Sequence, residues 1–126
     1  MRDIRVSRLI LAIGLMLGSA VAAQAQVGNA SRGKVLFQQR CGICHSVGPK
    51  ASGVGPNLAG VVGRKSAATT FNYSPAMKKA GLVWNIATLD AYLAAPMETV
   101  PGARMAISTP VAADRKDIIA YLATTR

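Results

Sequence analysis

Apolar residues recur every three or four positions in the stretch after residue 29, the spacing of one face of an α-helix. Gly33, Leu36 and Phe37 carry this pattern, and most of the positions between and beside them are polar. Asn29 stands just before the pattern begins, and an asparagine side chain can accept a hydrogen bond from an unpaired amide of the first helical turn. The sequence therefore predicts a helix over residues 30–41 with Asn29 as its N-cap.

Two shorter helices are expected in the middle of the chain. Ser74 followed by Pro75 is a favourable start, since serine caps helices well and proline fits the first helical position. Gly81 would end this helix, because glycine readily adopts the left-handed conformation found there. Thr88 is the candidate cap of the next helix, and Pro96 would stop it because proline cannot continue the backbone hydrogen bonding.

The last helix is expected over about residues 112–123, with Arg115 and Lys116 facing solvent. Its apolar side would consist of Ile118, Ile119, Tyr121 and Leu122. Residues 46–66 are rich in glycine and proline, and prolines recur in 97–110, so both stretches are expected to be loops. No run of strands is apparent. The predicted fold class is all-α, with about four helices and long loops that need something to pack on.

The start of the chain has the pattern of an export signal. Basic residues precede an uncharged apolar stretch over residues 9–23, and a small-residue Ala-Gln-Ala cleavage site ends at Ala25. The alternative is an uncleaved membrane anchor, but the apolar run is shorter than the ~20 residues that a spanning helix needs. We therefore predict a cleaved signal peptide at 1–25, Sec-type export to the periplasm, and one domain at 26–126 without stable membrane insertion.

Charge and composition narrow the class of function. The chain has 15 Lys and Arg against 5 Asp and Glu, a formal net charge of +10. These cations are dispersed and form no nucleic-acid motif, so no nucleic-acid partner is expected. A distributed positive surface either favours docking with acidic proteins or only keeps the protein soluble. Aromatic residues are few, with two Phe, one Trp and three Tyr, and a large flat apolar cofactor would complete so thin a core.

Cys41, Cys44 and His45 carry the most specific chemistry in the sequence. Two cysteines three positions apart, followed at once by the chain's only histidine, form the signature of c-type haem attachment. Each thiol would add to one vinyl group of the haem, and the imidazole would ligate the iron. A disulfide, a thioredoxin-like pair and a zinc site are the alternatives. The thioredoxin-like pair needs a βαβ setting that is not apparent, and zinc normally needs four ligands where the sequence offers three.

A second axial ligand must come from elsewhere in the chain, or the iron stays five-coordinate; no other histidine exists, so the methionines are considered. Outside the predicted signal peptide the candidates are Met77, Met97 and Met105. Met77 falls inside the short central helix and Met97 directly follows a proline. Met105 lies in a predicted loop where Pro101 and Gly102 can turn the chain and aim the side chain inward, so the spacing favours it. Core filling is the alternative role for any of the three.

These motifs together resemble the class I cytochromes c, near the mitochondrial proteins and their bacterial periplasmic relatives. The resemblance extends from about Gly33 to Leu122. The segments that carry it are Gly33-Lys-Val-Leu-Phe37, Gly55-Pro-Asn-Leu58, Gly60-Val-Val-Gly-Arg-Lys65, Thr88-Leu-Asp-Ala-Tyr-Leu-Ala-Ala-Pro96, Pro101-Gly-Ala-Arg-Met105 and Asp117-Ile-Ile-Ala-Tyr-Leu122. The resemblance implies the cytochrome c fold, in which helices and long loops wrap around a covalently bound haem.

The resemblance also implies the ligand set. One haem c would be held by thioether bonds to Cys41 and Cys44. His45 would be the proximal iron ligand and Met105 the distal one, and His/Met ligation raises the reduction potential. Gly33 would let the C-terminal helix approach the N-terminal one closely.

Further roles follow from the same resemblance. The Pro56 carbonyl would accept a hydrogen bond from the ring N–H of the proximal histidine, which fixes its tautomer. Tyr73 and Trp84 would hydrogen-bond a buried haem propionate, and Arg64 would offset part of that propionate's charge. Tyr92 would lie beside the methionine ligand. The alternatives are that Trp84 and Tyr92 are plain core aromatics and that Arg64 is a solvated loop residue.

The function that the resemblance implies is one-electron transport by a monomeric, low-spin haem protein that is not an enzyme. The implied partners are acidic redox proteins such as a membrane reductase and a terminal oxidase or dehydrogenase. Two alternatives stay open: a haem subunit of a larger periplasmic dehydrogenase, and a five-coordinate haem enzyme or sensor. Hydrolysis is not expected, because the one histidine is already used and leaves no base for a serine or cysteine nucleophile.

Overall fold

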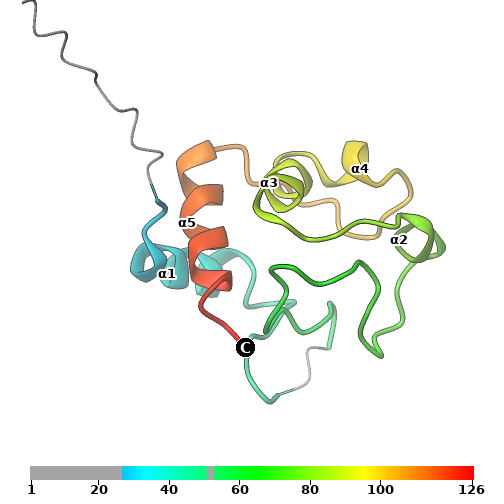
Figure 1. Cartoon of the computed structure of the whole chain (residues 1–126), viewed down its shortest axis with the longest axis horizontal. Helices are drawn as coiled ribbons and strands as arrows, with labels where there is room; N and C mark the ends of the chain where they lie inside the picture. The colour runs from blue at the N-terminus through cyan, green and yellow to red at the C-terminus, as the bar shows by residue number, and fades with distance from the viewer. Residues whose placement is uncertain (1–26, 51–52) are drawn as a thin grey trace, which may run out of the picture.

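The computed structural model describes residues 27–50 and 53–126, in which five helices are joined by long loops (Figure 1). The predicted signal peptide at 1–25 lies outside these residues. The described ranges contain no β-strand, and only an isolated bridge joins Lys65 and Val83. The all-α prediction is therefore confirmed.

Three helices begin and end close to their predicted positions. Helix α1 spans Ala30–Arg40, α2 spans Pro75–Lys79 and α5 spans Ala112–Leu122. The side chains of Asn29 and Ser74 cap α1 and α2, each accepting a hydrogen bond from the amide three residues further on. Both cap predictions are confirmed. They could be made from the sequence because a cap and the first turn that it bonds are close together in the chain.

Two boundaries in the middle of the chain were predicted wrongly. Helix α3 spans Ile86–Ala94, and its cap is Asn85, whose Oδ1 accepts from the Thr88 amide at 2.8 Å. Thr88 was expected to be the cap but lies in the first turn. The expected loop 97–110 begins with a short helix, α4, at Pro96–Thr99. Proline ends α3 but also fits the first position of a new helix, which the prediction overlooked.

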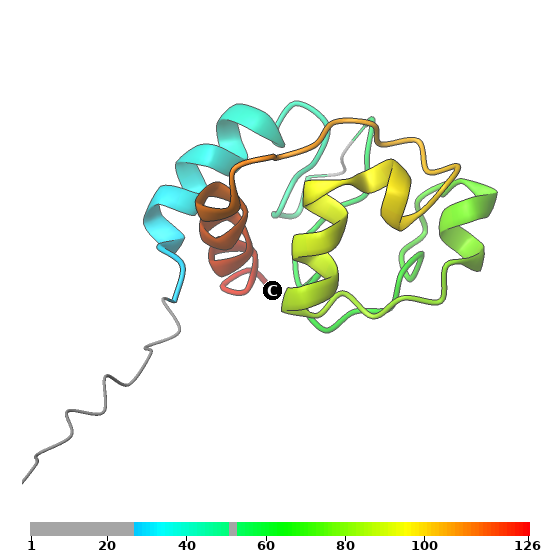
Figure 2. The ribbon, with the colours of Figure 1, turned by 90° about the horizontal axis from the view of Figure 1, so that it is seen from above.

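Helices α1 and α5 pack against each other at one end of the molecule (Figure 2). A methyl group built on Gly33 would overlap the backbone carbonyl of Asp117 and approach Tyr121, so the predicted close approach is confirmed. Arg32 on α1 spans the same contact and pairs with Asp114 at 2.6 Å and Asp117 at 2.5 Å. Close backbone packing and two ion pairs together fix how these two helices cross.

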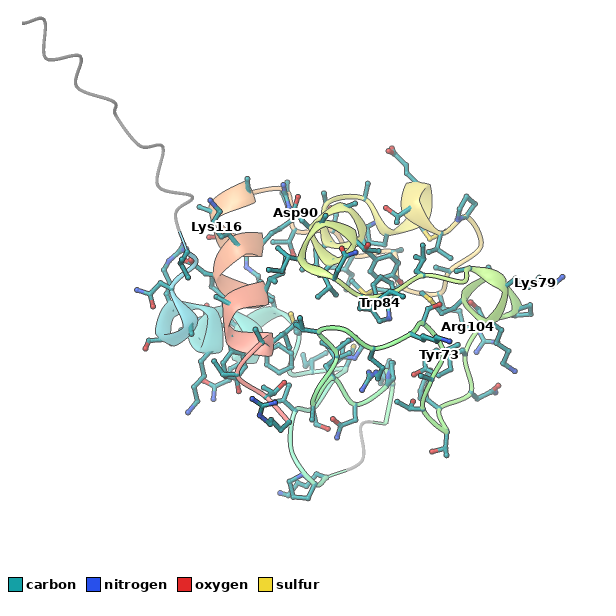
Figure 3. All side chains as sticks on the ribbon, viewed as in Figure 1. Tyr73, Lys79, Trp84, Asp90, Arg104 and Lys116 are labelled. Carbon is teal, nitrogen blue, oxygen red and sulfur yellow. The ribbon has the colours of Figure 1, made fainter. Side chains whose placement is uncertain are left out.

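Helix α3 packs on α5 and is joined to it by Arg115. The Arg115 side chain is only 12% exposed, and its Nε donates to Asp90 Oδ1 on α3 at 2.7 Å. The prediction that Arg115 faces solvent is therefore wrong, whereas Lys116 is exposed as predicted (Figure 3). Arginine can bury its aliphatic stem between helices when its guanidinium finds acceptors, and a hydropathy pattern does not reveal such acceptors.

The core lies between the α1–α5 pair, α3 and the loops. Its buried apolar residues are Leu36, Phe37, Val61, Tyr73, Met77, Trp84, Leu89, Tyr92, Val100, Ala103, Ile118, Ile119 and Leu122. Helices α2 and α4 lie toward the end opposite to α1, so the long loops link the two ends around the core (Figures 1 and 2). Among the described residues, no helix has both the length and the apolar character needed to span a bilayer.

Candidate functional site

A cavity of about 570 Å³ lies within this core, walled by α1, α3, α5 and the loops. Its lining is mostly apolar and includes Phe37, Leu58, Val61, Trp84, Leu89, Leu93, Ile118 and Leu122. Protein interiors normally contain few voids larger than one water molecule. A cavity of this size and character therefore fits a large apolar group that completes the core, as the low aromatic content suggested.

The end of α1 brings the attachment motif to the cavity. Cys41 follows the last residue of the helix, and its amide still bonds to the Phe37 carbonyl at 2.8 Å. The turn continues, because the His45 amide donates to the Cys41 carbonyl at 2.9 Å. Cys41, Cys44 and His45 consequently all line the cavity. Two thiols and an imidazole at one wall are the donor set that c-type haem attachment requires.

His45 is held in place by the loop that follows the motif. Its Nδ1 lies 2.7 Å from the Pro56 carbonyl oxygen, the contact that the resemblance implies. A carbonyl only accepts, so Nδ1 carries the proton and Nε2 is left with its lone pair to bind a metal. A methyl group built on Gly55 would overlap the His45 ring, so glycine is needed where the loop passes the imidazole. The loop thus fixes both the tautomer and the position of the ring.

Two of the three candidate methionines line the cavity. Met105 is half-buried and Met77 is 9% exposed, and both contribute to the lining. Met97 is 44% exposed and is absent from the lining, which argues against it as a ligand. The soft thioether donors at the cavity are therefore Met77, inside α2, and Met105, in the loop after α4.

The expected propionate partners also meet at the cavity, which Tyr73, Trp84 and Arg64 all line. Figure 3 shows Trp84 in the middle of the fold and Tyr73 near the end that holds α2. The Tyr73 hydroxyl lies 2.6 Å from Thr69 Oγ1. Arg64 donates to the carbonyls of two loop residues, at 2.9 and 3.0 Å, so it is not merely solvated. This corner supplies hydroxyl, indole and guanidinium donors in an otherwise apolar wall.

Tyr92 lies at the same cavity and packs on Trp84, with ring centroids 5.0 Å apart. Burial raises the pKa of the Tyr92 phenol, because the apolar surroundings disfavour its anion. Burial is also the largest cause that raises the pKa of the Cys41 thiol, against a smaller opposing effect of the Arg40 charge. The surroundings of Tyr92 and Cys41 therefore favour the neutral form of each of these two groups.

The sequence reasoning missed three residues of the site. Phe71 lines the cavity and stacks edge-on against Tyr73, and no pattern marked it. Thr69 was overlooked because its role arises only from the fold of the loop. Asn57 belongs to a segment already noted for its resemblance, and its Nδ2 donates to the Gly48 carbonyl at 2.6 Å. Its place next to Pro56 in that segment was the signal that could have identified it.

Comparisons with known proteins agree with this site. The sequence model of the family described as Cytochrome c matches residues 30–126. Cytochrome c2 of Rhodomicrobium vannielii is 46% identical over 115 residues, covering 86% of this chain and 91% of that protein. Cytochrome c2 of Rhodoblastus acidophilus is 45% identical over 98 residues, covering 75% of this chain and 91% of that protein.

A solved structure shares the fold. Cytochrome cH from Methylobacterium extorquens superposes with a TM-score of 0.73 at 40% sequence identity, covering 78% of this chain and all of that one. Fold, attachment motif and cavity thus agree with the family match over most of the chain. The chain therefore belongs to the cytochrome c family: it is a single-haem electron carrier, not an enzyme, and it holds its haem c covalently.

Proposed function

We propose that this protein is a periplasmic one-electron carrier whose haem is attached through Cys41 and Cys44 and whose iron is held by His45 and Met105. The observation that carries the proposal is that these four side chains line one apolar cavity. The hydrogen bond from His45 to Pro56 supports it further, because it leaves Nε2 free for the iron. Met77 lines the cavity too and is the competing thioether.

When bound, the haem supplies a reversible one-electron couple, and the chain's residues set the conditions for it. Pro56 orients the imidazole of His45, and a hydrogen bond to a ligating histidine increases its basicity. The Met105 thioether is neutral and soft, which favours the reduced state. Arg64, Tyr73 and Trp84 would balance the propionate charge, and the apolar lining would limit the entry of water. Tyr92 would support the methionine by packing.

The charge distribution supports acidic redox partners. Three of the four acidic residues in the described ranges, Asp90, Asp114 and Asp117, are ion-paired with arginines. The exposed positive side chains that would meet an acidic partner are Arg40, Lys50, Lys78, Lys79 and Arg104. Dispersed charge of one sign raises encounter rates and makes them sensitive to salt. A membrane reductase on one side and a terminal oxidase or dehydrogenase on the other fit this chemistry.

The proposal includes export to the periplasm and removal of the signal peptide, residues 1–25, which releases a monomer. Its main competitor is a haem subunit bound within a larger periplasmic dehydrogenase. Gel filtration of a native periplasmic extract distinguishes the two. The red haem absorbance should elute at the volume of a protein smaller than the full 13.1 kDa chain. Elution with a much larger complex would favour the dehydrogenase subunit.

The ligand assignment is tested by the weak far-red absorption band of the oxidised protein, which in this family reports a sulfur–iron bond. Met105→Ala should abolish the band, because no thioether then occupies the distal position. Met77→Leu and Met97→Leu should keep it. If Met77→Leu removes the band and Met105→Ala does not, the ligand is Met77 and the assignment is wrong. A wild-type protein without the band would contradict thioether ligation altogether.

A further inference from the structure

The segment that follows Met105 has no hydrogen bonds of its own. Within the part of the chain that the structure describes, residues 105–108 make none with backbone or side chains. The next residue, Thr109, is buried, and its amide donates to the Leu93 carbonyl at 2.7 Å. The position of Met105 therefore depends on how firmly the two ends of this short segment are held.

The end after Met105 is held by Arg115. Its Nη1 donates to the Thr109 carbonyl at 3.0 Å and to the Pro110 carbonyl at 2.8 Å. Its Nε donates to Asp90 Oδ1 at 2.7 Å. One guanidinium thus joins α5, the returning loop and α3. The Arg115 side chain is only 12% exposed, so water has limited access to its part-buried contacts with Asp90 and Thr109, whereas the contact with Pro110 is exposed.

The end before Met105 is held more weakly. Arg104 Nη1 donates to the Asn72 carbonyl at 3.0 Å, and this single contact is exposed to solvent. A methyl group built on Gly102 would come within 3.2 Å of Ala76, so this end of the loop also packs closely on α2. Arg115 is less exposed than Arg104 and has three acceptors instead of one, which indicates that it holds the segment more firmly.

We propose that Arg115 is a positioning residue for Met105: it holds residues 109–110 in place and thereby limits how far the thioether can withdraw from its ligand position. The inference rests on the proposed role of Met105. Arg115 does not line the cavity, so it acts only through the loop. Its Asp90 partner lies two residues before Tyr92 on α3, which links the same guanidinium to the helix that walls the site.

The test uses the oxidised holoprotein and added imidazole, which competes for the ligand position when the methionine leaves. Loss of the far-red band gives the apparent imidazole affinity. Arg115→Gln removes the guanidinium that makes all three hydrogen bonds and should raise this affinity at least about tenfold, the effect expected from losing a single charge-assisted hydrogen bond. Arg115→Lys keeps the charge but not the fork of donors, so it should lie between wild type and Arg115→Gln. If Arg115→Gln folds poorly, the imidazole affinity of Arg115→Lys still tests the proposal.

Two matched variants separate positioning from loss of charge and from general loosening. Lys116→Gln removes the same charge from the neighbouring exposed residue and should leave imidazole affinity unchanged. Arg32→Gln removes ion pairs on the side of α5 that faces α1, so it should lower the free energy of unfolding without raising imidazole affinity.

The outcomes distinguish this inference from the proposed function. The inference is overturned if Arg115→Gln and Arg115→Lys bind imidazole like wild type, or if Arg32→Gln raises the affinity as much as Arg115→Gln. A wild-type protein that lacks the far-red band would overturn the Met105 assignment, and the inference with it. If the wild type has the far-red band and both Arg115 variants resist its loss to imidazole equally well, the role of Arg115 is overturned while the Met105 assignment stands.

Discussion

Two loops hold the proposed iron ligands at the cavity, one that packs against His45 and one that carries Met105, and they are stabilised differently. The loop after the attachment motif, residues 53–64, contains hydrogen bonds of its own: the Val61 amide donates to the Leu58 carbonyl at 3.0 Å, and the Ala59 amide donates to Asn57 Oδ1 at 2.8 Å. Arg64 adds two donors to carbonyls of the same loop. The Met105 loop, by contrast, has none over residues 105–108 within the described chain.

This difference indicates how each proposed ligand is positioned. His45 is positioned by a loop that satisfies its own backbone, so its geometry is encoded almost entirely in neighbouring sequence. Met105 is positioned from outside, by Arg104, Arg115 and apolar packing. Segments with few internal hydrogen bonds open at lower free energy than segments with many. We therefore expect the methionine side of the site to yield first under perturbation.

The largest expected effect is on the His45 side. Gly55→Ala would place a methyl group against the imidazole ring, which the surrounding hydrogen bonds prevent from moving away easily. The free energy of unfolding of the holoprotein should fall by about 3 kcal/mol, the upper range for overpacking. Gly53→Ala is the control, since the space around that glycine is open and the change should stay within about 0.5 kcal/mol. Chemical denaturation followed by haem absorbance measures both.

A small loss of unfolding free energy in Gly55→Ala would contradict the contrast between the His45 loop and the Met105 loop. It would mean that the loop and His45 can shift together at little cost, so that the hydrogen bonds around Pro56 do not fix the ring. Equal losses in Gly53→Ala and Gly55→Ala would point to backbone flexibility as the cause instead of contact with the imidazole.

The second prediction compares one arginine from each loop. Arg64→Gln removes two hydrogen bonds from a partly buried guanidinium and should cost about 2 kcal/mol of unfolding free energy. Arg104→Gln removes one exposed hydrogen bond and should cost about 0.5 kcal/mol. Both variants lose one positive charge, so the difference between them reports the hydrogen bonds of Arg64 together with its proposed role in balancing the propionate charge. Urea denaturation at one ionic strength is sufficient, and a reversed order would refute the proposed contrast.

The contrast also explains what could be predicted from the sequence. The attachment motif, the caps Asn29 and Ser74, and the overall helical pattern depend on residues close together in the chain. The family resemblance indicated Pro56 and Arg64. Both residues lie in one continuous loop, so the segments that carry the resemblance could be recognised from neighbouring positions in the sequence. Local rules therefore predicted α1, α2, α5 and the attachment motif, and the family resemblance added Pro56 and Arg64.

The sequence failed to predict two kinds of feature: contacts with distant partners, and local features for which it offered two candidates or no pattern. Arg115 looked like a solvent-facing helix residue, because the carbonyls and the carboxylate that it meets become neighbours only after folding. Asn85 was missed as the cap of α3 because Thr88, three residues later, was an equally good candidate by type. Phe71 and Thr69 join the site through the fold of a loop that carries no periodic pattern.

The smallest expected effect concerns the α1–α5 contact, where Arg32 pairs with Asp114 and Asp117. The hydrogen bond from Arg32, followed by that from the Asn29 amide, holds the pKa of the Asp117 carboxyl below its ordinary value of 3.8. A carboxyl with a lowered folded pKa stabilises the protein above its unfolded pKa, and this stabilisation is lost as pH falls through the folded pKa. Stability of the wild type should therefore fall on acidification below about pH 4.

Arg32→Gln should weaken this dependence. Its unfolding free energy should be lower than that of wild type at neutral pH, and the two should converge as Asp117 is protonated. Lys34→Gln, an exposed change on the same helix, should run parallel to wild type. Denaturation at a series of pH values, followed at both the haem band and the far-red band, measures the effect. The two bands also show which side of the site opens first on acidification. If the wild type loses its His45 contact at a higher pH than its Met105 contact, Met105 is not the more weakly held side, and the contrast between the two loops is wrong.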